Sequence, residues 1–167
     1  MIFKARKHNH HLYNILLTLS RNIFFYKKIE LLDTFQTRIF LMFFHFAILM
    51  IISKEKGEKF DQDQYDSLFY NIENNLRELG HGDVSVNKKM KDLNKILYDI
   101  LLKIQLNTKN QNVKDSNKKI YIKYFEELKV QKNPKFVEFD NYFHSFYNYC
   151  SKLPLDNMLK QVINFKY

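Results

Sequence analysis

The run Leu76-Arg77-Glu78-Leu79-Gly80-His81-Gly82-Asp83 holds two of the three glycines of this 167-residue chain. A chain with so few glycines is expected to use them where a side chain would be costly, because glycine alone enters left-handed backbone at little steric cost. Amphipathic segments precede and follow the pair. The run therefore predicts a tight corner between two helices, with charges of both signs on it.

Apolar residues recur at helical spacing on both sides of this corner. Before it, the apolar stripe consists of Tyr65, Leu68, Phe69, Ile72, Leu76 and Leu79. After it, the stripe consists of Val86, Met90, Leu93, Leu97, Ile100, Leu101 and Ile104. We expect both leucines of the corner to face the core, Gly80 to be left-handed, and Gly82 to allow close approach of another backbone. Asp61 or Asp63 would cap the first of these helices, and Asp83 or Ser85 the second.

The rest of the chain also indicates helices. We expect helices over 9–25 and 33–53, shorter ones over 117–130 and 135–151, a last one after Pro154, and a polar loop over 107–116. Asp33 would be the N-cap of the second helix, with Gln36 completing a capping box. Hydrophobic residues make up 46% of the chain and aromatic residues 16%, which favours a folded protein. No alternating strand pattern, repeat or linker is present, so we predict one all-α, multi-helix domain over residues 1–167.

Residues 39–52 form an apolar run with His45 at its centre. The run is too short to span a bilayer by itself, and Arg38 and Lys54 flank it. A helix that is apolar all round is typical of the buried centre of a helical domain. We favour this interpretation, with insertion into a membrane as the alternative.

The net charge of +9 is unevenly distributed. Residues 31–84 have a balance of −4, whereas residues 1–30 have +5 and residues 85–135 have +8. Lys88, Lys91 and Lys95 recur along one helical face, with Lys89 beside them. This stripe would suit an anionic partner such as RNA or lipid headgroups, and an ordinary solvated face is the alternative.

Few residues suggest chemistry. The single cysteine, Cys150, excludes an intrachain disulfide and a CxxC metal site. His8, His10 and His11 lack a companion cysteine or acidic cluster, and we expect no metal site. His45 and His144 lie among apolar residues and are interpreted as hydrogen-bonded core or interface residues. No nucleophile–base spacing or Gly-rich phosphate loop is present, so we predict no enzyme activity, cofactor or small-molecule substrate.

The corner carries the most distinctive polar residues. Arg77 can pair with Glu73 one turn back or reach across to another helix. Asp83 could accept the free amides at the start of the next helix. We expect Arg77, Glu78 and Asp83 to form a buried set that needs both glycines, and a well-capped turn without further function is the alternative.

With the residues after it, the corner resembles the signature of the ubiquinol–cytochrome c chaperone family. That signature reads Leu-Arg-Glu-x-Gly-x-Gly-Asp, then an apolar-x-Val step and a basic cluster, here Val84-Ser85-Val86 and Lys88-Lys89-Met90-Lys91. The resemblance covers residues 12–105. Upstream positions that match in order are Tyr13, Ser20, Arg21, Phe25, Tyr26, Asp33, Thr34, Arg38, His45, Leu49 and Tyr65-Asp66-Ser67-Leu68-Phe69. The departures are Asn71 and Glu73 for aspartates, His81 for a small aliphatic residue, and Leu97-Tyr98-Asp99-Ile100 for a Phe-Tyr-Gly-Arg step.

The resemblance implies an all-helical, non-enzymatic factor that binds newly made cytochrome b during assembly of the cytochrome bc1 complex. Mitochondrial relatives act near the ribosomal exit with a small helical partner, so the ribosome and such a partner are expected here. The lack of a long presequence before the matching region favours a bacterial protein of the cytoplasm, peripheral at the inner membrane, or a matrix-side protein in a eukaryote. The residues expected to contact the client or partner are Arg77, Glu78, Gly80, Gly82, Asp83, Lys88, Lys89 and Lys91.

Two alternatives belong to other functional classes. One is a basic helical module that binds RNA or the ribosome and has no respiratory client. The other is a peripheral membrane protein that uses the helix over 39–52.

Overall fold

The computed structural model describes residues 11–106, 116–130 and 135–167. His8, His10 and most of the expected loop over 107–116 lie outside the described residues. Within these ranges the chain is helical and has no strand, so the all-α prediction is confirmed. The α-helices are α1 (His11–Ser20), α2 (Phe35–Glu55), α3 (Gln62–Glu78), α4 (Asp83–Lys103), α5 (Lys118–Tyr124), α6 (Glu127–Val130), α7 (Phe136–Ser151) and α8 (Leu155–Gln161). A π-helical turn, η1 (Phe24–Lys28), follows α1, and a 3₁₀ turn, η2 (Val162–Asn164), follows α8.

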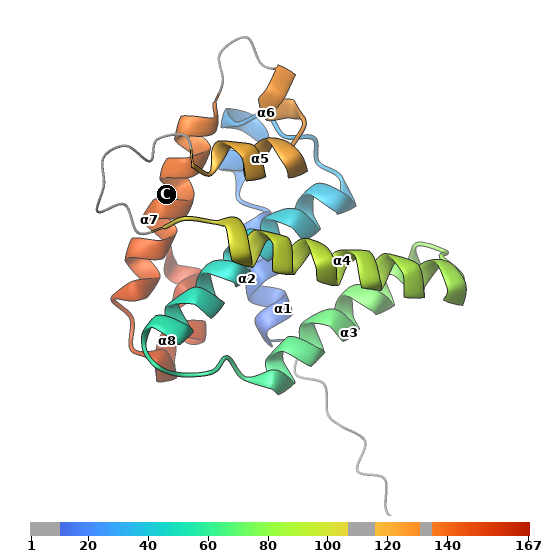
Figure 1. Cartoon of the computed structure of the whole chain (residues 1–167), viewed down its shortest axis with the longest axis horizontal. Helices are drawn as coiled ribbons and strands as arrows, with labels where there is room; N and C mark the ends of the chain where they lie inside the picture. Colours follow the sequence, from blue (N-terminus) through green and yellow to red (C-terminus); the bar gives the residue numbers. More distant parts are fainter. Residues whose placement is uncertain (1–10, 107–115, 131–134) are drawn as a thin grey trace, which may run out of the picture.

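Helix α2 runs through the middle of the molecule (Figure 1). Every residue from 39 to 49 is buried, and α1, α4 and α7 pack against it. Among the described residues α2 is also the one helix long and apolar enough to cross a membrane, yet 72% of that apolar stretch is buried inside the fold. The interpretation of residues 39–52 as a core helix is therefore confirmed.

His45 connects α2 to α7 at the centre of the core. The ring is fully buried, and its Nδ1 lies 2.7 Å from the carbonyl oxygen of Leu41 while its Nε2 lies 2.9 Å from the hydroxyl of Tyr142. A carbonyl can only accept, so Nδ1 carries the proton and Nε2 accepts from the tyrosine. Burial lowers the pKa of His45 to about 4 and keeps the ring neutral.

His144 also has a partner inside the fold. Its Nε2 lies 3.2 Å from the carboxylate of Asp140 one helical turn earlier, and this hydrogen bond raises the pKa of the imidazole. The expectation that both apolar-flanked histidines are hydrogen-bonded is confirmed.

Helices α3 and α4 form an antiparallel hairpin whose corner projects from the helical body (Figure 1). The hydroxyl of Tyr65 donates to Asn94 at 2.9 Å, and the side chain of Asn75 bonds to the hydroxyl of Tyr13, which connects the hairpin to α1. Near the corner, Leu76 and Val86 are buried, although neither belongs to the main core cluster. The end of the hairpin therefore has its own small apolar interior.

Helix boundaries differ from the predictions where side chains find other partners. The N-cap of α2 is Thr34, not Asp33: its hydroxyl accepts from the Thr37 amide at 3.1 Å. The carboxylate of Asp33 instead accepts a hydrogen bond from the guanidinium of Arg38 at 2.7 Å. It is therefore not the cap of the first amides of α2, as the capping-box prediction required. For α3, the predicted N-cap Asp61 is confirmed.

The helix expected over 9–25 ends at Ser20. The side chain of Asn22 accepts from the amide of Phe24 at 3.0 Å, and the backbone continues as the π-helical turn. Asparagine side chains commonly compete in this way with helical hydrogen bonds. The segment expected over 117–130 is likewise divided, into α5 and α6.

The substitution Tyr142→Phe tests the central hydrogen bond. It leaves Nε2 of His45 buried without a donor, so we expect the free energy of unfolding to fall by about 1–3 kcal/mol in chemical denaturation. Tyr167→Phe is the control, because Tyr167 is half exposed and its loss of a hydroxyl should change stability by less than about 0.5 kcal/mol. Equal effects of the two changes would contradict the assigned role of Tyr142.

His45 and His144 should titrate in opposite directions from the ordinary histidine pKa. NMR titration should place the His45 midpoint near pH 4 and the His144 midpoint above the ordinary histidine value. Because the pKa of His45 is depressed in the fold, its contribution to stability is present above about pH 6.5 and is lost as pH falls toward 4, by about 3 kcal/mol. A His45 midpoint near its unperturbed value would contradict the burial of this ring.

Candidate functional site

The backbone of the corner explains the first of the two glycines. Helix α3 ends in a Schellman arrangement. The Gly80 amide donates to the backbone carbonyl of Arg77 at 2.9 Å, and the His81 amide donates to the backbone carbonyl of Leu76 at 3.2 Å. Gly80 has φ +92°, a conformation that side chains rarely adopt. The prediction of a left-handed glycine at this position is confirmed.

The second glycine has a different role from the one expected. Gly82 is the N-cap of α4 with φ −75°, and an added Cβ would meet nothing within 4 Å. The prediction that Gly82 allows close backbone approach is therefore wrong. The predicted caps Asp83 and Ser85 are also wrong, because α4 already begins at Asp83 and the carboxylate of Asp83 turns to Arg77.

Arg77 connects the end of α3 to the start of α4 on the surface of the corner. Its guanidinium bonds Glu73 on α3 at 2.8 Å and also bonds Asp83 on α4, so both partners anticipated for it are present. These hydrogen bonds, chiefly the one to Asp83, raise the pKa of Arg77. The set is solvent-exposed, with 82% of the Asp83 side chain accessible, and Glu78 is exposed too. The prediction of a buried charged set is wrong, because the corner lies beyond the core.

Two exposed apolar side chains lie at the same corner. Leu79 is 58% exposed and Val84 is 86% exposed. Leu79 was expected in the core, but α3 ends at Glu78 and the turn carries the next residue outward. Val84 was not predicted as a contact residue. Apolar side chains beside ion-paired charges are characteristic of protein interaction surfaces.

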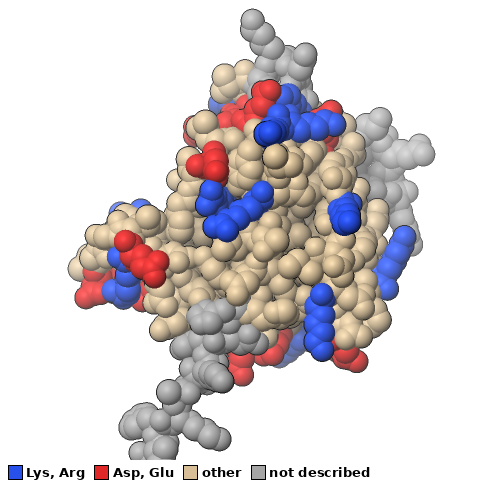
Figure 2. Space-filling model, turned by 180° about the vertical axis from the view of Figure 1, so that it is seen from behind, with Lys and Arg blue, Asp and Glu red and all other residues tan. Residues whose placement is uncertain are grey.

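The basic stripe continues from the corner along α4. Lys88, Lys89 and Lys91 are all exposed, and Lys95 lies 3.9 Å from Asp92. Seen from behind, the projecting hairpin gathers charges of both signs, whereas much of the face beside it carries few (Figure 2). The structure thus places the three lysines and the corner on one projecting element.

A pocket of about 250 Å³ lies between this hairpin and the start of α2. Lys89, from the predicted site, borders it, and so does His81 of the corner, which is half-buried. Its other lining residues are mainly apolar and comprise Phe35, Gln36, Ile39, Phe40, Leu76, Asp92, Leu93 and Ile96. The predicted site is therefore bordered by a small hollow with an apolar floor.

Within the described ranges, no group of three or more His, Cys, Asp or Glu side chains is placed to hold a metal ion. Burial raises the pKa of the Cys150 thiol to about 12. A thiol that stays protonated at neutral pH is a weak nucleophile.

The family model described as ubiquinol-cytochrome C chaperone matches residues 27–133. The chain belongs to this family. The matched region includes α2, the α3–α4 corner, α4, α5 and α6, while α1, α7 and α8 lie outside it. Membership implies a role in assembly of the cytochrome bc1 complex, in a family that is generally non-catalytic, and suggests complex III components as partners. Neither the curated proteins nor the solved structures contain a match.

The two corner glycines give a matched pair of substitutions. Gly80→Ala should lower the free energy of unfolding by about 1–2 kcal/mol, because φ +92° is strained for any side chain. Gly82→Ala should change it by less than about 0.5 kcal/mol, since the N-cap loss and the reduced freedom of the unfolded chain oppose each other. Thermal or chemical unfolding of both variants checks this. Equal destabilisation would contradict the Schellman assignment.

Proposed function

We propose that this protein is a non-enzymatic assembly chaperone that binds newly made cytochrome b through the α3–α4 corner. The observation that carries the proposal is the projection of this corner, with Leu79 and Val84 exposed at its end. The family match supports a role in bc1 assembly, and the choice of cytochrome b as client is our proposal.

Apolar contact residues suit a client whose segments are destined for a membrane, because such segments expose apolar surface before they are assembled. The ion-paired Arg77 and Asp83 and the neighbouring Glu78 surround this apolar tip with charge. Charges at the edge of an interface guide the orientation of a partner more than they add affinity. We propose Arg77, Glu78 and Asp83 as the charged contact set, with Gly80 and Gly82 fixing the turn that presents it.

Lys88, Lys89 and Lys91 would add an electrostatic contact next to the corner. Three exposed lysines on one helix can bind phosphates with little selectivity, which also favours a second candidate function, binding of RNA or the ribosome. The two functions are compatible if the protein meets its client while the client is being synthesised. We propose that the protein acts on the cytoplasmic side of a bacterial membrane, or on the matrix side in a mitochondrion, with a small helical partner as a further expected component.

Co-purification from solubilised membranes tests the proposal. Tagged protein should recover cytochrome b, and Leu79→Ser combined with Val84→Ser should reduce the recovery by about tenfold, because both exposed contact residues are lost. The fold should be unaffected, since neither side chain is in the core. Normal bc1 assembly in a strain that lacks the gene would contradict the proposal.

Charge substitutions separate the two candidate functions. Changing Lys88, Lys89 and Lys91 to Gln should weaken RNA binding and flatten its salt dependence, because about three phosphate contacts are lost. The matched control changes three exposed lysines away from the corner, Lys152, Lys160 and Lys166, to Gln. If RNA binding is weak for the native protein and cytochrome b is still recovered, the RNA-binding function is excluded and the chaperone function stands.

A further inference from the structure

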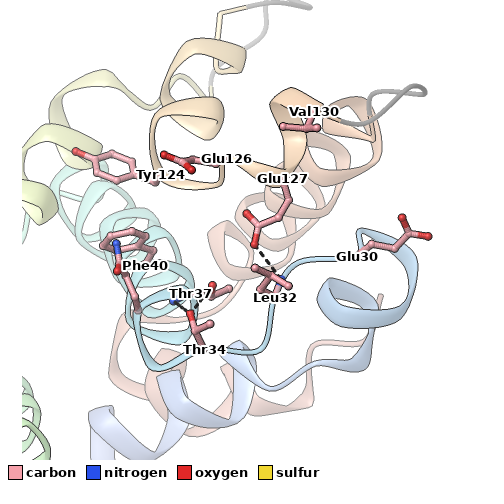
Figure 3. A pocket seen from close by; sticks show the side chains of 10 residues that line it. Glu30, Leu32, Thr34, Thr37, Phe40, Tyr124, Glu126, Glu127 and Val130 are labelled. Carbon is pink, nitrogen blue, oxygen red and sulfur yellow. Dashed lines mark hydrogen bonds between the residues drawn. The ribbon is translucent and has the colours of Figure 1, made fainter.

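A second pocket, of about 520 Å³, lies on the other side of the start of α2 (Figure 3). It is formed where the segment over 30–37 meets the end of α5 and the start of α6, more than eighty residues later in the chain. The residues that line it are Glu30, Leu32, Thr34, Gln36, Thr37, Phe40, Tyr124, Glu126, Glu127 and Val130. None of the residues proposed to contact cytochrome b is among them.

The walls of this pocket expose apolar side chains. Two large aliphatic residues at its rim are exposed to solvent: Leu32 is 64% exposed and Val130 is 80% exposed. Phe40 and Tyr124 pack edge to face against each other with ring centroids 5.2 Å apart, and both border the pocket. Apolar side chains that converge on one cavity are typical of a binding surface.

The polar part of the rim is acidic. Among the described residues that line the pocket, the charged ones are Glu30, Glu126 and Glu127 and none is lysine or arginine, in a chain where basic residues outnumber acidic ones by 27 to 18. Lys135 pairs with Glu30 at 2.8 Å. No ion pair joins Glu126 or Glu127 to a basic residue in the part of the chain that the structure describes.

The position of one carboxylate is fixed. Oε1 of Glu127 accepts the amide of Leu32 at 2.9 Å, which holds α6 against the segment before α2. Figure 3 shows Glu126 on the same wall beside Tyr124, while Glu30 lies at the outer edge of the pocket. Glu126 and Glu127 thus place negative charge directly beside the apolar walls.

We propose that this pocket binds a segment of another protein in which a lysine or arginine lies next to a large apolar side chain. The apolar side chain enters between Leu32, Val130 and Phe40, and the cation lies against Glu126 and Glu127. Charge complementarity favours this occupant over a lipid surface, because anionic headgroups would meet the two carboxylates.

This pocket of about 520 Å³, hereafter the acidic pocket, adjoins the pocket of about 250 Å³ at the α3–α4 corner. Gln36 and Phe40 line both of them, so the first turn of α2 separates two adjoining hollows. A basic partner segment bound in the acidic pocket would lie close to whatever occupies the corner. The proposal for the acidic pocket does not rest on the proposed function, because none of the residues proposed to contact cytochrome b lines this pocket.

Binding of a designed peptide to the full chain tests the proposal. The probe is an amphipathic helical peptide of leucine and lysine, and the comparison peptide has glutamate in place of each lysine. The lysine peptide should bind, should shift the methyl NMR signals of Leu32 and Val130, and should bind less tightly as salt rises. The variant E126Q/E127Q should weaken it about tenfold, since the side-chain oxygen of a glutamine at position 127 still accepts the Leu32 amide while both charges are lost.

The matched control is E58Q/D63N, which removes two exposed acidic charges far from the pocket and should leave the affinity unchanged. Leu32→Ser should also weaken the lysine peptide by about tenfold. Equal binding of both peptides, equal effects of the two charge variants, or shifts confined to other methyl groups would each overturn the proposal. If lipid vesicles shift the same methyl signals and the peptide does not, the proposal of a protein partner is overturned and the pocket contacts a membrane instead.

Discussion

The fold depends on the need to cover α2 on every side. A helix that is apolar all round gains stability only if other helices remove its whole surface from water, and α1, α4 and α7 do so. Inside this core the His45–Tyr142 hydrogen bond provides the polar connection between α2 and α7. Helix α4 has 21 residues, and of its first dozen only Val86 is buried. Its first half therefore projects beyond the core together with the end of α3, and the corner is exposed as a consequence.

The helices could be predicted because their signals are local. A glycine after an apolar stripe marks the end of a helix, and Gly80 ends α3 as expected. Asp33 and Asp83 were misassigned as caps for one reason: each carboxylate pairs with an arginine that lies five or six residues away. Whether such a carboxylate accepts from a helix amide or from an arginine guanidinium depends on how the backbone turns. The spacing of the residues in the sequence does not determine it.

The candidate site could be predicted in part. The corner motif and the family were recognisable from the sequence, because the residues that define them are contiguous. The exposure of Leu79 was not predictable from the stripe, since periodicity does not show where a helix leaves the core. The acidic pocket was not predictable either, because it joins residues near 32 to residues near 127, and only the tertiary packing brings these segments together.

The two hollows beside the first turn of α2 differ in the charges that line them. The charged residues that line one of them are Lys89 and Asp92, whereas those that line the other are three glutamates. If the proposals for both surfaces hold, the protein could bind a client at the corner and a basic partner segment in the adjoining acidic pocket at the same time. In this account the core determines where the surfaces lie, and the charges determine what each surface accepts.

Site-specific photocrosslinking tests the central claim, that the α3–α4 corner contacts cytochrome b. A photoreactive residue at position 84 of the tagged protein, in membranes that are synthesising the bc1 complex, is predicted to form an adduct that contains cytochrome b. The same residue at position 163, which is also exposed but lies near the end of the chain, should form no such adduct. Equal crosslinking from both positions, or none from position 84 while cytochrome b is being made, would contradict the account.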